Sequence, residues 1–89
     1  MTKIVVNRRR PGYFILSDQA CAELDCTHFD YNDYDKRNNP KLVECVEKLG
    51  KAAGGRTTNL EVVEIPDDVE WTIEEYDGSE WVAEEHRTW

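Results

Sequence analysis

The amino-acid sequence predicts a small α+β domain in which two helices cover one face of a mostly antiparallel sheet. Three observations lead to this prediction: a β-branched run near the start, an amphipathic helical pattern in the middle, and alternating strands around a tight-turn signal near the end. The expected order of elements is approximately βαβαβββ. With 89 residues the chain is large enough for one hydrophobic core, so residues 1–89 are expected to form a single domain.

The first third of the chain contains signals for a strand, a helix and a second strand. Residues 3–7 form a short β-branched run that ends at the basic turn 8–12, which is typical of a strand followed by a turn. Ser17 is a favourable N-cap residue, so a helix is expected over residues 18–25. Residues 28–34 alternate between apolar and polar side chains, which indicates a half-exposed strand.

The remaining elements are marked by a helix start and by a hairpin turn. Asn39 and Pro40 supply the N-cap and the first-turn proline of a second helix, whose apolar residues recur at helical spacing until Gly54 and Gly55. Strands are expected over 60–65, 69–76 and 80–83, with Asp77-Gly78 as a two-residue turn.

That tight turn has a consequence for two acidic side chains. A two-residue turn places Glu75 opposite Glu80, which is unfavourable unless a cation lies beside the pair. One of the basic segments of the chain is expected to supply this cation.

Charge is divided into blocks along a chain whose net charge is −8. Residues 1–16 hold four basic and no acidic residues, residues 17–35 hold six acids and no base, residues 36–58 hold six bases and two acids, and residues 59–89 hold eleven acids and one base. Because like charges repel, basic and acidic segments are expected to face one another in the fold or across a subunit interface.

The composition argues against several classes of protein. Cys21, Cys26 and Cys45 are odd in number and form no CxxC pair, so reduced core thiols are expected rather than disulfides or a metal site. No serine-hydrolase, zinc-protease or nucleotide-loop motif is present, so we expect no enzymatic activity and no cofactor. The acidic charge disfavours direct DNA binding, and the lack of a long apolar segment predicts a cytoplasmic protein without membrane contact.

Two segments are candidates for function. In the turn that follows the first strand, Arg8 and the exposed backbone at Gly12 could hold a phosphate or carboxylate group, although the turn could instead be neutralised by the acidic strands. At the end of the chain, His86, Arg87 and Trp89 could stack on a base and bind a phosphate, although Trp89 could instead cap the core or a neighbouring subunit.

Both ends of the sequence resemble a family of small uncharacterised proteins encoded by bacteriophages and prophages. The matching segments are KIVVNR at 3–8, the pattern GxFxLS at 12–17, VVEIPDDVEW at 62–71, EYDG at 75–78, Glu80-Trp81 and HRTW at 86–89. The family tends to have a single Arg followed by Cys and an aromatic residue, where this chain has Arg9, Arg10 and Pro11. The resemblance implies a phage accessory protein in a bacterial host, and it implies no particular activity.

Two hypotheses for function follow from the residues and the resemblance together. In the first, a homo-oligomer sequesters an anionic small molecule, such as a nucleotide immune signal of the host, as an anti-defence protein that uses Arg8, Gly12, His86, Arg87 and Trp89. In the alternative, the acidic surface imitates nucleic acid or binds a basic host protein such as a nuclease. The two hypotheses differ in which surface is functional.

Overall fold

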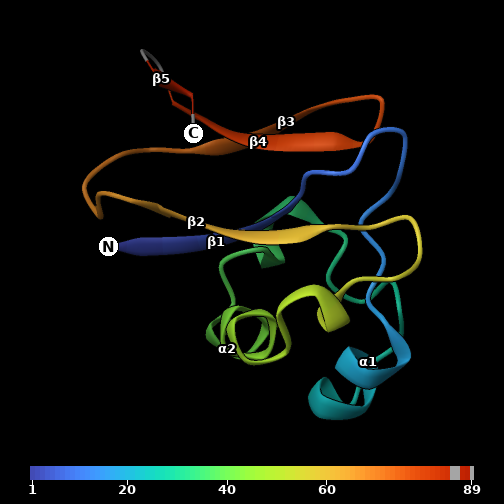
Figure 1. The fold of residues 1–89 in the computed structure, drawn as a ribbon. Coiled ribbons are helices and arrows are strands. Elements are labelled where there is room, and N and C mark those ends of the chain that lie inside the picture. The colour runs from blue at the N-terminus through green and yellow to red at the C-terminus, as the bar shows by residue number, and fades with distance from the viewer. Residues whose placement is uncertain (85–86, 89) are drawn as a thin grey trace.

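The computed structural model describes residues 1–84 together with the backbone of residues 87 and 88. It confirms an α+β fold with antiparallel strands and two helices on one face (Figure 1). The elements in chain order are β1 (Thr2–Asn7), α1 (Asp18–Leu24), the 3-10 turn η1 (Tyr34–Lys36), α2 (Pro40–Leu49), the 3-10 turn η2 (Gly50–Ala53), β2 (Leu60–Ile65), β3 (Thr72–Tyr76), β4 (Ser79–Glu84) and β5 (Arg87–Thr88).

The strands form two sheets that lie in separate layers, rather than one continuous sheet. β1 pairs with β2, with Thr2 opposite Ile65, and β3, β4 and β5 form an antiparallel three-stranded sheet. Figure 1 shows the β1–β2 sheet in the middle, with the helices on one side and the β3–β4 hairpin on the other. The middle layer is therefore covered on both faces.

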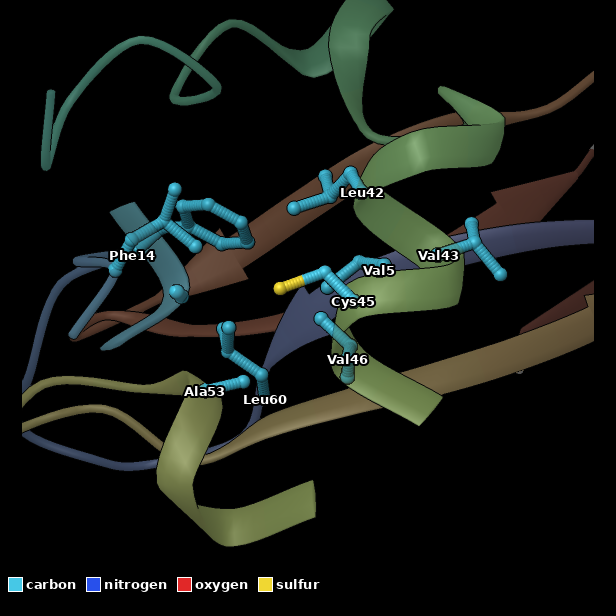
Figure 2. Close-up of a cluster of buried hydrophobic side chains, with 10 residues drawn as sticks. Val5, Phe14, Leu42, Val43, Cys45, Val46, Ala53 and Leu60 are labelled. Carbon is cyan, nitrogen blue, oxygen red and sulfur yellow. The ribbon is translucent and has the colours of Figure 1, made fainter. Parts of the chain in front are cut away.

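The central residues of β1 are all apolar because each face of the strand packs against a core. Val5 belongs to a cluster on the helix side, whereas Ile4 and Val6 belong to a cluster on the hairpin side, and all three are fully buried. Figure 2 shows Val5 beside Cys45 and Val46 of α2 in the helix-side cluster. A strand buried on both faces reads as a continuous hydrophobic run, which explains the sequence Ile-Val-Val.

Both helices begin where their capping residues predicted. The Ser17 side chain accepts a hydrogen bond from the Ala20 N–H at the start of α1, and the Asn39 side chain accepts one from Lys41 N–H at the start of α2. The expected end of the second helix at Gly54-Gly55 is wrong for the α-helical part. α2 ends at Leu49 because Gly50 adopts a φ of +57°, and η2 continues the chain to Ala53.

The strand expected over residues 28–34 is absent, and turns followed by η1 occupy this segment. The second edge of β1, where a further strand could pair, is already satisfied by two other groups. The Val5 N–H donates to the Arg37 carbonyl at 2.8 Å, and the Asn7 N–H donates to the Glu80 carboxylate at 2.8 Å. A carbonyl from a turn and a side chain thus take the place of a strand ladder.

The hairpin forms around the predicted turn, with Asp77 at φ +52° and Gly78 at φ +91°. Its register places Glu75 opposite Glu80, as expected. β3 begins at Thr72 instead of residue 69, because residues 66–71 carry the chain from the middle layer to the outer one, with the Asp67 carboxylate held by the Thr2 hydroxyl at 2.9 Å. None of the helices in residues 1–84 is long and apolar enough to span a membrane.

Candidate functional site

A buried ion pair between Arg37 and Glu80 joins the segment after η1 to β4. The side chains are paired through two hydrogen bonds, from Nη1 to Oε1 at 2.6 Å and from Nη2 to Oε2 at 2.9 Å. Arg37 is 1% exposed and Glu80 is 5% exposed. This bidentate geometry is the strongest form of an arginine–carboxylate contact.

The other donors of the Arg37 guanidinium are also occupied. Nε donates to the Tyr31 carbonyl at 2.9 Å, Nη2 to the Asn32 carbonyl at 3.0 Å, and Nη1 to the Val5 carbonyl at 3.4 Å. The Phe14 ring covers the guanidinium, with its centroid 3.6 Å from the Arg37 Cζ atom. Since a guanidinium has five N–H donors and all five are used, Arg37 orders the structure and offers no donor to a ligand.

Asn7, at the end of β1, connects the pair to the two adjoining turns. Its backbone N–H bonds Glu80, and its side chain is fully buried. The amide oxygen accepts from the N–H groups of Arg9 and Asn59, and the amide nitrogen donates to the Gly78 carbonyl at 2.9 Å. One residue thereby fixes the basic turn, the start of β2 and the hairpin turn relative to one another.

A pocket of about 280 Å³ lies over the ion pair, where these segments meet. It is bordered by three segments, the residues after the basic turn, the residues around η1 and the hairpin turn, and its lining consists of Gly12, Tyr13, Phe14, Asn32, Tyr34, Arg37, Glu75, Gly78 and Glu80. Three of these residues are aromatic, and two of them, Tyr13 and Tyr34, are 74% and 41% exposed. The pocket thus combines accessible aromatic rings with carboxylate and amide groups.

One polar atom in the lining of this pocket lacks a partner. The Oδ1 atom of Asn32 is buried, yet it accepts no hydrogen bond from any of the described residues. Buried side-chain acceptors without a partner are uncommon in folded proteins, because an unmade hydrogen bond costs about 1–3 kcal/mol. A residue that borders the pocket, Asn32, therefore has an acceptor atom that no described residue uses.

The electrostatic environment of the pocket is negative. It contains two carboxylates, those of Glu75 and Glu80, and one guanidinium, that of Arg37. Burial raises the pKa of Tyr34, and the charges of Glu80 and Glu75 raise it further, whereas Arg37 lowers it. Such a pocket favours a ligand that brings N–H donors or positive charge over one that places a phosphate inside.

The structure places the predicted site residues of the basic turn in two different roles. Gly12 lies in the wall of the pocket, where a Cβ atom would overlap the carbonyl oxygen of Thr57. Arg8 is partly buried and bridges two strands, with Nε donating to Glu61 at 2.6 Å and Nη1 to the Glu80 carbonyl at 3.0 Å. The acidic strands therefore engage Arg8, as the alternative interpretation of the turn expected.

The C-terminal candidates lie away from this turn as far as the structure describes them. The backbone of Arg87 pairs with Glu84, at the end of β4 opposite to Ser79, whose hydroxyl donates to the Arg8 carbonyl at 3.3 Å. Five residues of strand span about 17 Å, and Figure 1 shows the basic turn and β5 at opposite ends of the hairpin. His86 and Trp89 lie outside the described residues. Within one chain, the structure does not bring Arg8 and the backbone of Arg87 together.

Two further arginines lie on the same turn as Gly12. Arg10 is 3.8 Å from the Asp77 carboxylate and stacks over the Tyr76 ring at 5.0 Å, and Arg9 is exposed without a side-chain partner among the described residues. The turn that borders the pocket therefore carries two solvent-facing guanidinium groups.

Sequence reasoning missed most of the pocket, although one signal pointed toward it. The expected pairing of Glu75 with Glu80 called for a nearby cation from a basic segment, and Arg37 of the basic block 36–58 is that cation. Nothing in the local pattern distinguished Arg37 from the other basic residues of that block, and Asn32 and Tyr34 belonged to a segment expected to be a strand.

Three comparisons, with protein-family models, with curated proteins and with solved structures, found no match for this chain. No group of three or more His, Cys, Asp or Glu side chains in residues 1–84 is arranged to hold a metal ion.

Proposed function

We propose that this protein acts by stoichiometric binding, without catalysis, and that its ligand is a nucleotide whose base enters the pocket over the Arg37–Glu80 pair. The observation that carries the proposal is that Asn32, a residue of the pocket lining, has a buried Oδ1 atom with no partner among the described residues. A base supplies N–H donors for such an acceptor and a flat surface for stacking on aromatic rings.

The charge distribution supports one orientation of the nucleotide. Carboxylates outnumber cations in the pocket, so a phosphate placed inside would be repelled. Arg9 and Arg10, on the adjoining turn, are exposed and can receive a phosphate outside it. A volume of about 280 Å³ also suits a base with the remainder of the nucleotide outside.

The proposal extends to the biological setting that the sequence resemblance implies. A phage protein that captures a nucleotide signal of its host would act as an anti-defence protein by keeping the signal from its receptor. In a symmetric homo-oligomer, His86, Arg87 and Trp89 of a second copy would close over the bound nucleotide. This arrangement would bring the C-terminal residues of one copy to the pocket of another, because the backbone of Arg87 lies far from the basic turn of its own chain.

A melting screen tests whether any nucleotide binds this pocket. Mono-, di- and cyclic nucleotides are added to the wild type and to Tyr34→Ala, which removes an aromatic wall, with Phe29→Ala as a control at an exposed aromatic residue that does not line the pocket. A ligand at a hundred times its Kd stabilises the folded state by about 2.7 kcal/mol. We expect this stabilisation for the wild type and Phe29→Ala and its loss in Tyr34→Ala. If no nucleotide raises the melting temperature of the wild type, the proposal is wrong.

A second candidate function, binding of a basic host protein by an acidic surface that imitates nucleic acid, is favoured by a different observation. Glu70 and Glu74 are exposed and form no ion pair with the described residues. Glu74 lies opposite the half-buried Trp81 in the hairpin. Recovery of a basic protein from host lysate by the wild type, but not by a Glu70→Gln/Glu74→Gln variant, would support this function.

A further inference from the structure

We infer that the base which the pocket selects is guanine, an inference that depends on the proposed nucleotide-binding function. Two residues of the lining carry acceptor atoms whose hydrogen-bonding capacity is not used up by the described residues. Asn32 contributes its unpartnered Oδ1 atom. Glu75 contributes a carboxylate that accepts only from the Gly78 N–H, at 3.0 Å, among the described residues.

Glu75 differs from Glu80, the other carboxylate of the pocket, in the state of its charge. Glu80 is buried and neutralised by the bidentate contact with Arg37, and one of its oxygens also receives the Asn7 N–H. Glu75 is exposed and has no ion pair with the described residues. The pocket therefore presents one uncompensated carboxylate, and a ligand that brings two parallel N–H donors satisfies both of its oxygens.

Among the common bases, guanine alone presents two adjacent N–H donors on its Watson–Crick edge, namely N1–H and the 2-amino group. Adenine and cytosine each place a ring-nitrogen acceptor beside their amino group, and this acceptor would face the carboxylate lone pairs. Uracil has a single N–H between two carbonyl oxygens. A carboxylate without a compensating cation, as Glu75 provides in this pocket, therefore discriminates in favour of guanine.

The aromatic lining is compatible with a purine but does not choose between purines. Tyr34 and Tyr13 expose ring surface in the same pocket, and every base can stack on such a surface. Selectivity for guanine must then come from the acceptors. This separation allows stacking and hydrogen bonding to be tested by different changes.

The test measures the Kd of GMP, IMP and AMP for the wild-type protein by isothermal titration calorimetry. IMP retains N1–H but lacks the 2-amino group, so it removes one donor without any change in the protein. We expect IMP to bind at least tenfold more weakly than GMP, and AMP to bind more weakly still. Agmatine is included because its guanidinium offers the same pair of donors without a base.

Two matched variants locate the selectivity. Glu75→Gln replaces one carboxylate oxygen by an amide nitrogen and should weaken GMP binding at least tenfold, whereas Glu74→Gln, next in sequence and exposed on the opposite face of β3, should leave the GMP Kd unchanged. Circular dichroism spectra and urea midpoints are measured for both variants to check that each is folded.

The outcomes separate this inference from the function on which it depends. If AMP or UMP binds as tightly as GMP and Tyr34→Ala abolishes that binding, the nucleotide function stands and guanine selection is overturned. Tighter binding of agmatine than of GMP overturns guanine selection, and so does an unchanged GMP Kd in Glu75→Gln. If no nucleotide binds the wild type, both proposals fail.

Discussion

The buried Arg37–Glu80 pair leads to a prediction about stability that can be made quantitatively. In a Glu80→Gln variant, the side chain keeps its shape and can still accept a hydrogen bond from the Asn7 N–H, but it loses its charge. Arg37 then remains 1% exposed with no compensating charge. Removing one partner of a buried pair costs about 3–5 kcal/mol, so we expect a loss of that size.

The size of this loss matters because the domain is small. At 0.05–0.15 kcal/mol per residue, 89 residues correspond to about 4–13 kcal/mol of total stability. A loss of about 3–5 kcal/mol would therefore remove a large part of the folding free energy. With a urea m-value of about 1 kcal/mol per molar, the midpoint should fall by about 3 M or more, which tryptophan fluorescence can follow.

A double-mutant cycle distinguishes a lost pair from general damage to the core. Arg37→Met combined with Glu80→Gln removes the uncompensated charge, so the two losses should not add, and the coupling energy should be about 1–3 kcal/mol. Glu75→Gln is the control, because Glu75 is exposed and its change should stay within about 0.5 kcal/mol. An unchanged urea midpoint for Glu80→Gln would refute the argument that this pair organises the fold.

Three further predictions concern the core, the thiols and the hairpin turn. Leu42→Ala should lower stability by about 2–5 kcal/mol in urea titrations, because Leu42 is fully buried. Burial raises the pKa of Cys26 to about 11, so its alkylation at pH 8 should be much slower in the native than in the unfolded protein. Because the unfolded thiol loses its proton first, stability should decline as pH rises above about 8.5. Gly78→Ala, at φ +91° against the Gly12 carbonyl, should lower the melting temperature more than Gly50→Ala, which meets no neighbouring atom.

The elements that could be predicted from the sequence have local causes. The start of α2 follows from Asn39 and Pro40, and the hairpin register follows from the two residues Asp77 and Gly78, whose positive φ angles suit a tight turn. Once that register is fixed, the opposition of Glu75 and Glu80 is a geometric consequence. Such features require no knowledge of the rest of the chain.

The elements that could not be predicted depend on contacts between distant segments. The residues 28–34 have a plausible strand pattern, but the edge of β1 is satisfied by Arg37, 32 residues from Val5, and by Glu80, 73 residues from Asn7. A basic residue in a charged segment is ordinarily assigned to the surface. Arg37 is buried because the fold brings Glu80, the Phe14 ring and three carbonyl groups together around it. The local sequence around Arg37 does not predict these contacts.

The division of charge along the sequence is explained by the ion pairs of the fold. Basic residues of the first block contact acids of the last block, as in Arg8–Glu61 and Arg10–Asp77, and the second basic block supplies Arg37 to Glu80. Most such surface pairs contribute little to stability. Their main effect is to neutralise particular acidic residues, so that the remaining negative charge lies on the acids without ion pairs.

The acids left without ion pairs among the described residues include neighbours on β3 that point in opposite directions. Glu74 faces outward from the hairpin, whereas Glu75 lies in the wall of the pocket together with Asn32, whose buried Oδ1 atom has no partner among the described residues. Because Arg37 is saturated by its own contacts, no side chain in the pocket offers a free positive charge to compensate Glu75. A ligand must therefore bring the donors itself, and this requirement follows from the way the buried pair uses the local cation.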